Sequence, residues 1–366
     1  MRQNLGQLLR RATVGVLALT ALWAPCGPTA VAATAAPSAP APEAEALPFG
    51  ERYRALQHGG IVRAANSSAT CRTSASSCRS VQNGTRPGVN GDFDMHYIDV
   101  DDDPNTYNSS QGEVRLPQGS RVTYARLYWG GNLLVGEQKP AEDNERVLVA
   151  EPGGNYKELL ADTVVGHRAA GGMDAFQASA DVTRLVRDSG SGLYTVAQIN
   201  VAGGRSTAGA WGGWTLVVAY ENAAEPLRHL SVWDGFAPLS GDSGATFALR
   251  NLPYPADAGG RVGMVAYNGD RGTAGDSLVL TAGDTATALG NGANPADDVL
   301  NSTVSNPASA PSSRVPAYAN TLGYDSDVFD LGGLLTRAGD QASVRLTSQR
   351  DAAWAGVLFA AVDARP

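Results

Sequence analysis

The chain has 366 residues, a formal net charge of −8, 43 glycines and only 17% charged residues. A composition rich in glycine and poor in charge disfavours a helical protein, and the recurring short apolar runs exclude a disordered one. The acidic balance excludes general electrostatic attraction to nucleic acid or to anionic membranes.

Residues 1–32 are typical of a signal peptide. Arg10 and Arg11 precede an apolar run at 12–23, and small residues suited to cleavage follow it. The run is too short to span a bilayer. We therefore expect a secreted, extracellular protein, free or loosely associated with the cell wall, with no membrane attachment once the leader is removed. Residues 33–50 are rich in alanine and proline and predict a linker.

The cysteines agree with export. If Cys26 leaves with the leader, Cys71 and Cys78 remain. An even pair outside the cell predicts a disulfide, with two free thiols as the alternative. No histidine flanks the pair, so a metal site there is disfavoured.

From Tyr53 onward, short apolar stretches alternate with turns rich in Gly, Asn, Asp and Pro, and no window predicts a long amphipathic helix. The best helical signal is one or two turns at 181–186, with Asp181 as the N-cap. We expect strands at 93–99, 121–129, 146–150, 193–201, 211–220, 229–234, 246–250, 261–267, 299–304, 343–346 and 354–362.

Four sequence elements recur in the same order, roughly 140 residues apart, which predicts an internal duplication. The matched pairs are 113–117 with 249–253, 121–128 with 261–267, 181–185 with 327–331, and 211–218 with 354–359. A period this long makes each copy a whole domain. We therefore expect an all-β fold of two tandem antiparallel β-sandwich units, jelly-roll-like, at 51–224 and 225–366, with short helical turns only.

Two short motifs imitate serine nucleophile loops. Residues 275–278 spell Gly-Asp-Ser-Leu, as in a class of lipases and esterases, and 241–244 spell Gly-Asp-Ser-Gly, as in serine proteases. The first class needs a histidine near the C-terminal end, but the last histidine is His229, and no histidine lies in the context that the second class requires. We interpret both motifs as turns and predict no catalytic residue.

An acidic run ends one predicted strand and imitates the start of a Ca²⁺-binding loop. Its candidate ligands are Asp99, Asp101, Asp103 and Asn105. Proline at 104 and serine at 110 exclude an EF-hand but not a Ca²⁺ site of the kind found in β-sandwiches. The alternative is a set of acidic turns whose side chains cap their own backbone. The second copy has comparable candidate ligands in Asp270, Asp276, Asp325 and Asp327.

Trp129, Trp211 and Trp233 adjoin glycine-rich turns. Partly exposed rings there would form a platform for the apolar faces of sugars, whereas rings in the core would have no ligand role. Trp214 and Trp354 adjoin apolar runs and are expected in the core.

Two resemblances carry further expectations. Residues 181–186 with 192–196 look like a segment common in galactose-binding-like jelly rolls, in which a short helical turn precedes a core strand. A broader set of motifs, over about 53–363, resembles a secreted module of Gram-positive surface proteins that often precedes conserved surface repeats and a wall anchor. Its residues are 93–101, 108–110, 125–131, 180–183, 213–218, 233–236, 265–270, 275–278 and 320–325. This chain shows neither the repeats nor the anchor.

Together these observations lead us to expect a non-catalytic extracellular protein of the cell surface or matrix, with an adhesive or structural role. Its partners would be a wall or matrix glycan or a surface protein. A glycan-binding module, assisted by Ca²⁺ or not, is the alternative. A carbohydrate-active hydrolase is a third reading, and it requires two carboxylates facing each other across a cleft.

Overall fold

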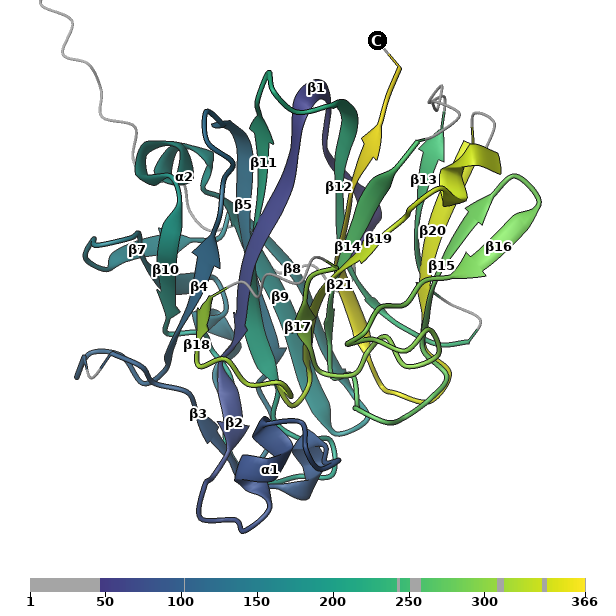
Figure 1. The fold of residues 1–366 in the computed structure, drawn as a ribbon. Helices are drawn as coiled ribbons and strands as arrows, with labels where there is room; N and C mark the ends of the chain where they lie inside the picture. Colours follow the sequence, from purple (N-terminus) through teal and green to yellow (C-terminus); the bar gives the residue numbers. More distant parts are fainter. Residues whose placement is uncertain are drawn as a thin grey trace, which may run out of the picture. The chain divides into compact units, whose positions relative to one another are not determined.

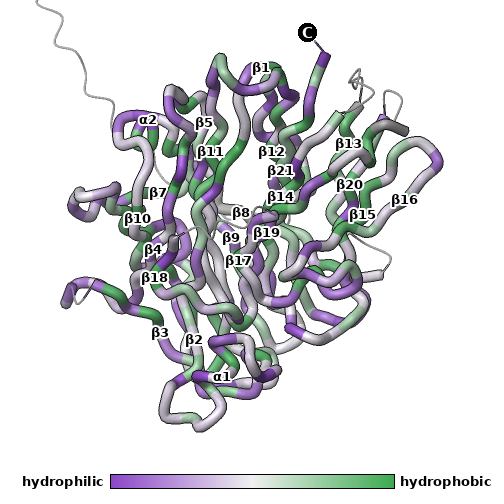
Figure 2. The backbone as a smooth tube through the Cα atoms, in the orientation of Figure 1, coloured by the Kyte–Doolittle hydropathy of each residue, from purple (hydrophilic) through white to green (hydrophobic). Residues whose placement is uncertain are grey.

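The computed structural model describes residues 47–101, 103–241, 244–250, 258–307, 313–337 and 341–365. The expected leader, most of the expected linker and the serine of the 241–244 motif lie outside these ranges. The structure is 51% strand and 7% helix, which confirms the all-β, sandwich-like prediction (Figure 1). Hydrophobic and hydrophilic residues alternate along many strands, as expected where one face of a sheet is buried (Figure 2).

One sheet of ten strands forms the centre of the fold. Its order is β17 (Val304–Ser305), β19 (Tyr324–Asp330), β14 (Gly260–Tyr267), β21 (Trp354–Asp363), β12 (Leu227–Pro238), β1 (Leu47–Ser67), β11 (Gly212–Glu221), β5 (Arg121–Asn132), β9 (Met173–Asp181) and β8 (Thr163–Ala170). The pairs are antiparallel except for β17 with β19.

Strand β1 joins the two halves of this sheet. Its residues 47–58 pair with β12, the first strand of the second half, and its residues 59–67 pair with β11, the last strand of the first half. We call residues 47–221 the first half and 227–363 the second half. The boundary expected at 224/225 falls in the turn between β11 and β12, and β1 begins inside the expected linker.

Each half adds a smaller sheet and an apolar core of its own. The small sheet against the first half has the order β18 (Arg314–Val315), β4 (Ser109–Val114), β10 (Gly192–Ala197), β6 (Arg146–Ala150) and β7 (Lys157–Leu160), and its edge strand β18 is contributed by the second half. In the second half the order is β13 (Ala245–Arg250), β20 (Gln341–Thr347), β15 (Ser277–Ala282) and β16 (Thr285–Ala288). The core residues come from the small sheet and from the facing side of the large sheet in each half.

The strands pair in the same order in both halves. β5 lies between β11 and β9, as β14 lies between β21 and β19. In the small sheets β10 lies between β4 and β6, as β20 lies between β13 and β15, and β7 and β16 follow at the same edge. This shared order is what a duplicated unit would produce.

A third apolar cluster, the shared core, joins side chains of the two halves. It consists of Ala65, Tyr124, Tyr128, Met173, Ala175, Trp211, Val217, Ala219, Leu230, Val232, Phe236, Val265, Tyr267, Tyr324, Val328, Trp354, Val357, Phe359 and Ala361. These residues alternate along their strands with the residues of the two separate cores. Both faces of the central strands are therefore buried, which explains why β11 and β21 are almost continuously apolar.

Glycines make room for tyrosine rings in the shared core. A Cβ atom on Gly213 of β11 would lie 2.7 Å from Cγ of Tyr324 in the second half. The Tyr324 hydroxyl lies 2.7 Å from Thr215 Oγ1, and Gln177 of β9 accepts a hydrogen bond from the Tyr267 hydroxyl at 2.9 Å. The polar tips of the rings are thus satisfied inside the shared core.

The remaining regular elements are short. They are β2 (Ala69–Cys71), β3 (Met95–Tyr97), α1 (Cys78–Gln82), α2 (Thr183–Ser189) and the 3₁₀ turns Asn90–Asp92, Ala141–Asp143 and Leu334–Arg337. The helical turn expected at 181–186 forms at Thr183–Ser189 as α2, and its N-cap is Val182, so the prediction of Asp181 as N-cap is wrong. Asp181 Oδ1 accepts a hydrogen bond from the Thr183 N–H at 2.8 Å. The strand expected at 299–304 is wrong for 299–303, which are irregular. Among the described residues, no helix has the length and apolar character to cross a membrane.

The predicted disulfide is confirmed. Cys71 ends β2 and Cys78 begins α1, with their Cα atoms 5.8 Å apart. Both side chains are fully buried in a small cluster that includes Val81, Phe93 and Met95. The bond therefore fastens α1 to the short β2–β3 ladder.

We predict that Cys71→Ala with Cys78→Ala lowers the free energy of unfolding by about 2.5 kcal/mol, because the cross-link restricts a short loop of the unfolded chain. Urea denaturation measures this change. Wild-type protein under strong reductant should lose the same stability. An unchanged urea midpoint in both would contradict the prediction.

We also predict that Gly213→Ala lowers the free energy of unfolding by about 1–3 kcal/mol, because the added methyl group overpacks the shared core. Gly50→Ala is the matched control, since Gly50 is also on the large sheet but has no atom within 4 Å of the added carbon. Equal urea midpoints for the two variants would contradict the packing described for Tyr324.

Candidate functional site

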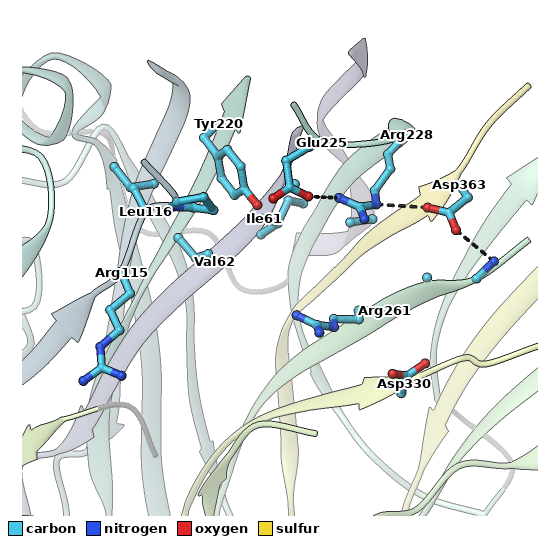
Figure 3. A pocket seen from close by; sticks show the side chains of 15 residues that line it. Ile61, Val62, Arg115, Leu116, Tyr220, Glu225, Arg228, Arg261, Asp330 and Asp363 are labelled. Atoms are coloured by element: carbon cyan, nitrogen blue, oxygen red, sulfur yellow. Dashed lines mark hydrogen bonds and ion pairs between the residues drawn. The ribbon is translucent and has the colours of Figure 1, made fainter. Parts of the chain in front are cut away.

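A groove of about 670 Å³ opens where both halves meet β1. Its wall from the first half comes from β1, the chain after β4, and the end of β11, and its wall from the second half comes from β12, β14, β19 and β21 (Figure 3). The lining residues are Gly60, Ile61, Val62, Arg115, Leu116, Pro117, Tyr220, Glu225, Arg228, Gly259, Gly260, Arg261, Asp330, Ala361 and Asp363.

Arg228 organises one side of the groove. Its guanidinium donates to Glu225 Oε2 at 3.0 Å, to Asp363 Oδ1 at 3.0 Å and to the Gly59 carbonyl at 2.6 Å. The other oxygen of Asp363 accepts the Gly259 N–H at 3.0 Å. Figure 3 shows this row of charges along the upper edge of the groove. Arg228 therefore holds both carboxylates, and a backbone N–H also holds Asp363.

Arg261 and Arg115 line the groove across from this row of charges. Arg115 pairs with Glu113 at 2.9 Å. Arg261 is exposed and lies opposite Asp330 in the β14–β19 ladder. Within the described ranges its side chain has neither a hydrogen bond nor an ion pair. In Figure 3 its side chain extends into the groove. It is the lining cation best placed to meet a ligand.

Apolar groups form the floor between these charges. Ile61 and Val62 of β1 and Leu116 face the groove, and the Tyr220 ring lies among them with its hydroxyl directed inward (Figure 3). Partial burial of the Tyr220 phenol raises its pKa, so the hydroxyl stays a hydrogen-bond donor at neutral pH. The groove combines an apolar floor with charged and hydroxyl groups at its rim.

A second hollow of about 160 Å³ shares Ile61, Val62, Arg115 and Arg261 with the groove. It adds Arg63, Glu113, Asn306, Pro307, Val328 and Phe359. Since both hollows follow β1 and have residues in common, a ligand longer than the first can extend into the second.

The predicted tryptophan platform is wrong for two of its three rings. Trp129 and Trp211 are both 0% exposed, Trp129 in the core of the first half and Trp211 in the shared core. The Trp129 indole donates to the Asn144 carbonyl at 2.8 Å. Trp233 is partly buried and stacks on Phe247 at 6.1 Å between centroids. The neighbouring glycines therefore do not expose Trp129 or Trp211.

The predicted Ca²⁺ loop has its oxygens engaged in turns. Asp101 Oδ1 accepts the Asp103 N–H, Asp103 Oδ1 accepts the Asn105 N–H, and Asp99 Oδ1 accepts the Ser109 hydroxyl, all at 2.8–3.1 Å. These are the self-capping bonds of acidic turns. Among the described residues, no three His, Cys, Asp or Glu side chains are already arranged as a metal-ligand set. A Ca²⁺ site at 99–105 stays a prediction.

Among the described residues, the Ser277 hydroxyl has no hydrogen bond to a histidine that could act as its general base. Ser277 begins β15, and its hydroxyl lies 3.3 Å from Thr347 Oγ1. His229, the last histidine, lies on β12, and burial lowers the pKa of its imidazole.

A second polar site is a cluster of four aspartates in the second half, Asp270, Asp276, Asp298 and Asp351, which we call the acidic pocket. The Asp270 N–H donates to Asp351 Oδ2 at 2.9 Å, and residues 276 and 298 form an isolated parallel bridge. Asp270 and Asp276 were named from the sequence; Asp298 and Asp351 were missed because loops distant in sequence bring them together.

Burial is the main cause of unusual pKa values in the acidic pocket. It raises the pKa of Asp270 to about 7, helped by the charge of Asp351. It also raises the pKa values of Asp276 and Asp351, which interact strongly, and that of Asp298. Each charged form is disfavoured in the folded protein relative to the unfolded chain.

We predict that, in metal-free buffer, the melting temperature falls as pH rises from about 4 through 7. These carboxyl groups have raised pKa values in the folded state, so their contribution is complete below the unfolded-state pKa of about 4 and is lost as they ionise. Thermal unfolding across this range measures the effect. A melting temperature that rises steadily from pH 5 to pH 8 would contradict it, and Asp270→Asn should flatten the profile.

No protein-family model matches the chain, and no curated protein matches it. Two solved structures show partial similarity at 12% identity. PNGase F, a glycosylasparaginase from Flavobacterium meningosepticum, aligns over 73% of this chain and 94% of its own with a TM-score of 0.23. The major capsid protein P2 from bacteriophage PM2 aligns over 72% and 95% with a TM-score of 0.19. Similarity this low carries no functional argument.

Proposed function

We propose that the protein is a secreted, non-catalytic protein of the cell surface or matrix that binds a glycan in the groove beside β1. The observation that carries the proposal is the groove itself, where Arg261, whose side chain has no partner among the described residues, and an inward-facing Tyr220 hydroxyl border an apolar floor. The signal-like leader, the disulfide and the resemblance to Gram-positive surface modules support the location.

The chemistry of the lining favours a glycan over a simple anion or an apolar ligand. Three arginines and three carboxylates line the groove, so its charges nearly balance. Sugar hydroxyls both donate and accept hydrogen bonds, and they can therefore bind carboxylates and guanidinium groups that are already paired. Ile61, Val62 and Leu116 offer apolar contact for the carbon faces of the sugar rings. The volume is within the range of small-ligand sites.

The arrangement of the carboxylates supports binding without hydrolysis. Glycoside hydrolysis uses two carboxyl groups that face the scissile bond from either side. Glu225 and Asp363 instead share Arg228 between them, and Asp330 Oδ1 accepts the Gly332 N–H at 2.8 Å. We therefore assign the charged row to ligand positioning.

The test is a glycan array of wall and matrix polysaccharides, followed by titration calorimetry of the best ligand. We predict that Arg261→Ala weakens binding about tenfold, because one charge-assisted hydrogen bond is lost. Arg184→Ala is the matched control: its side chain on α2 is 95% exposed and does not line the groove.

Two results would refute the proposal. One is an array with no ligand at micromolar concentrations. The other is a ligand whose affinity is the same in wild type and Arg261→Ala, which would place its binding elsewhere on the protein.

A further inference from the structure

The acidic pocket is built by separate loops. Asp270 follows β14, Asp276 precedes β15, Asp298 lies in the long connection after β16, and Asp351 lies between β20 and β21. The backbone holds them in place: Gly272 N–H donates to Asp298 Oδ2 at 3.0 Å, and Asp276 N–H donates to the carbonyl of residue 297 at 3.2 Å.

Several oxygens of this pocket are buried without a donor. Asp276 is 0% exposed, and its carboxylate lies beside the Ser348 hydroxyl and the Asp351 carboxyl, but neither of its oxygens makes a hydrogen bond of ordinary geometry in the described structure. Asp270 Oδ1 and Asp298 Oδ1 are buried and unpartnered in the same way. A buried charge with no partner is costly, so these carboxylates favour the uptake of a proton or of a cation.

The surrounding charges do not supply that neutralisation. Arg271 is the cation that acts on Asp298, and its Nη1 donates to the Ala319 carbonyl at 3.2 Å. Asp92 acts on Asp270, and residue 297 is a further aspartate beside Asp298. Within the described part of the chain, the pocket thus has an excess of negative charge.

A proton and a metal cation are the two available occupants. A proton shared by Asp276 and Asp351 would satisfy that pair, but it leaves Asp270 Oδ1 and Asp298 Oδ1 without partners. A divalent cation can satisfy all four unpartnered oxygens together. The donors are all hard oxygens, which Ca²⁺ prefers, and its coordination is flexible.

We propose that Asp270, Asp276, Asp298 and Asp351 close around one Ca²⁺ ion in the second half. The side chains are not already arranged as a ligand set. Closing requires rotation of the carboxylates about their side-chain bonds, while the loop backbone stays in place. The site is independent of the proposed glycan groove and shares no residue with it.

The experiment compares thermal unfolding and titration calorimetry of the mature protein with Ca²⁺ and with chelator. The expected result is a higher melting temperature in Ca²⁺, reversed by chelator, because an ion bound only by the folded state stabilises it. Asp276→Asn with Asp298→Asn should weaken Ca²⁺ binding at least tenfold and abolish the shift. A cooperative transition of this variant in chelator shows that it is folded.

Asp103→Asn is the control that separates this site from the turn at 99–105. It should keep the full Ca²⁺ shift. The proposal is overturned if Ca²⁺ produces neither heat nor a shift in wild type, if the double variant responds like wild type, or if Asp103→Asn loses the response. A response to Mg²⁺ equal to that to Ca²⁺ would overturn the assignment of the ion.

Discussion

The packing of the two halves on each other through the shared core is the constraint on which the rest of the fold depends. Strand β1 hydrogen-bonds to both halves, so they share a single large sheet. The tyrosines of the second half fit against glycines of the first, as Tyr324 does on Gly213. A sandwich unit alone would expose the face that carries Trp211 and Tyr267. Each half therefore needs its partner to bury that face.

The groove is a consequence of the same arrangement. Its walls belong to different halves, with Arg115 and Tyr220 on one and Arg261 and Asp363 on the other. A ligand bound there contacts both halves at once, so binding and the joining of the halves are thermodynamically linked. The acidic pocket differs in this respect, since its four aspartates all come from loops of the second half.

Much of the fold followed from local pattern. Short alternating apolar runs and closely spaced turns predicted strands such as β6 and β14, and the expected helical turn forms two residues later than predicted, after Asp181 has ended β9. The disulfide followed from two cysteines in a chain that was expected to be exported. The strand prediction for 299–303 was wrong because the apolar residues Val299 and Leu300 belong to an irregular loop that contributes to the core of the second half.

The sites were harder to predict because they depend on distant contacts. Local sequence could not show that Trp129 and Trp211 are covered, because the layers over them come from elsewhere in the chain. The high density of aspartates at 99–105 predicted a Ca²⁺ site, yet the carboxylates of Asp101 and Asp103 accept backbone N–H groups of their own turn. Asp276 and Asp298 lie 22 positions apart in sequence, and a parallel backbone bridge brings the two residues together. The groove likewise has no contiguous motif.

Differential scanning calorimetry of the mature protein tests the central claim most directly. If the shared core unites the two halves, the chain unfolds in one transition whose calorimetric and van't Hoff enthalpies agree. Two separate transitions, each with about half of the total enthalpy, would show that the halves fold independently and would contradict the account.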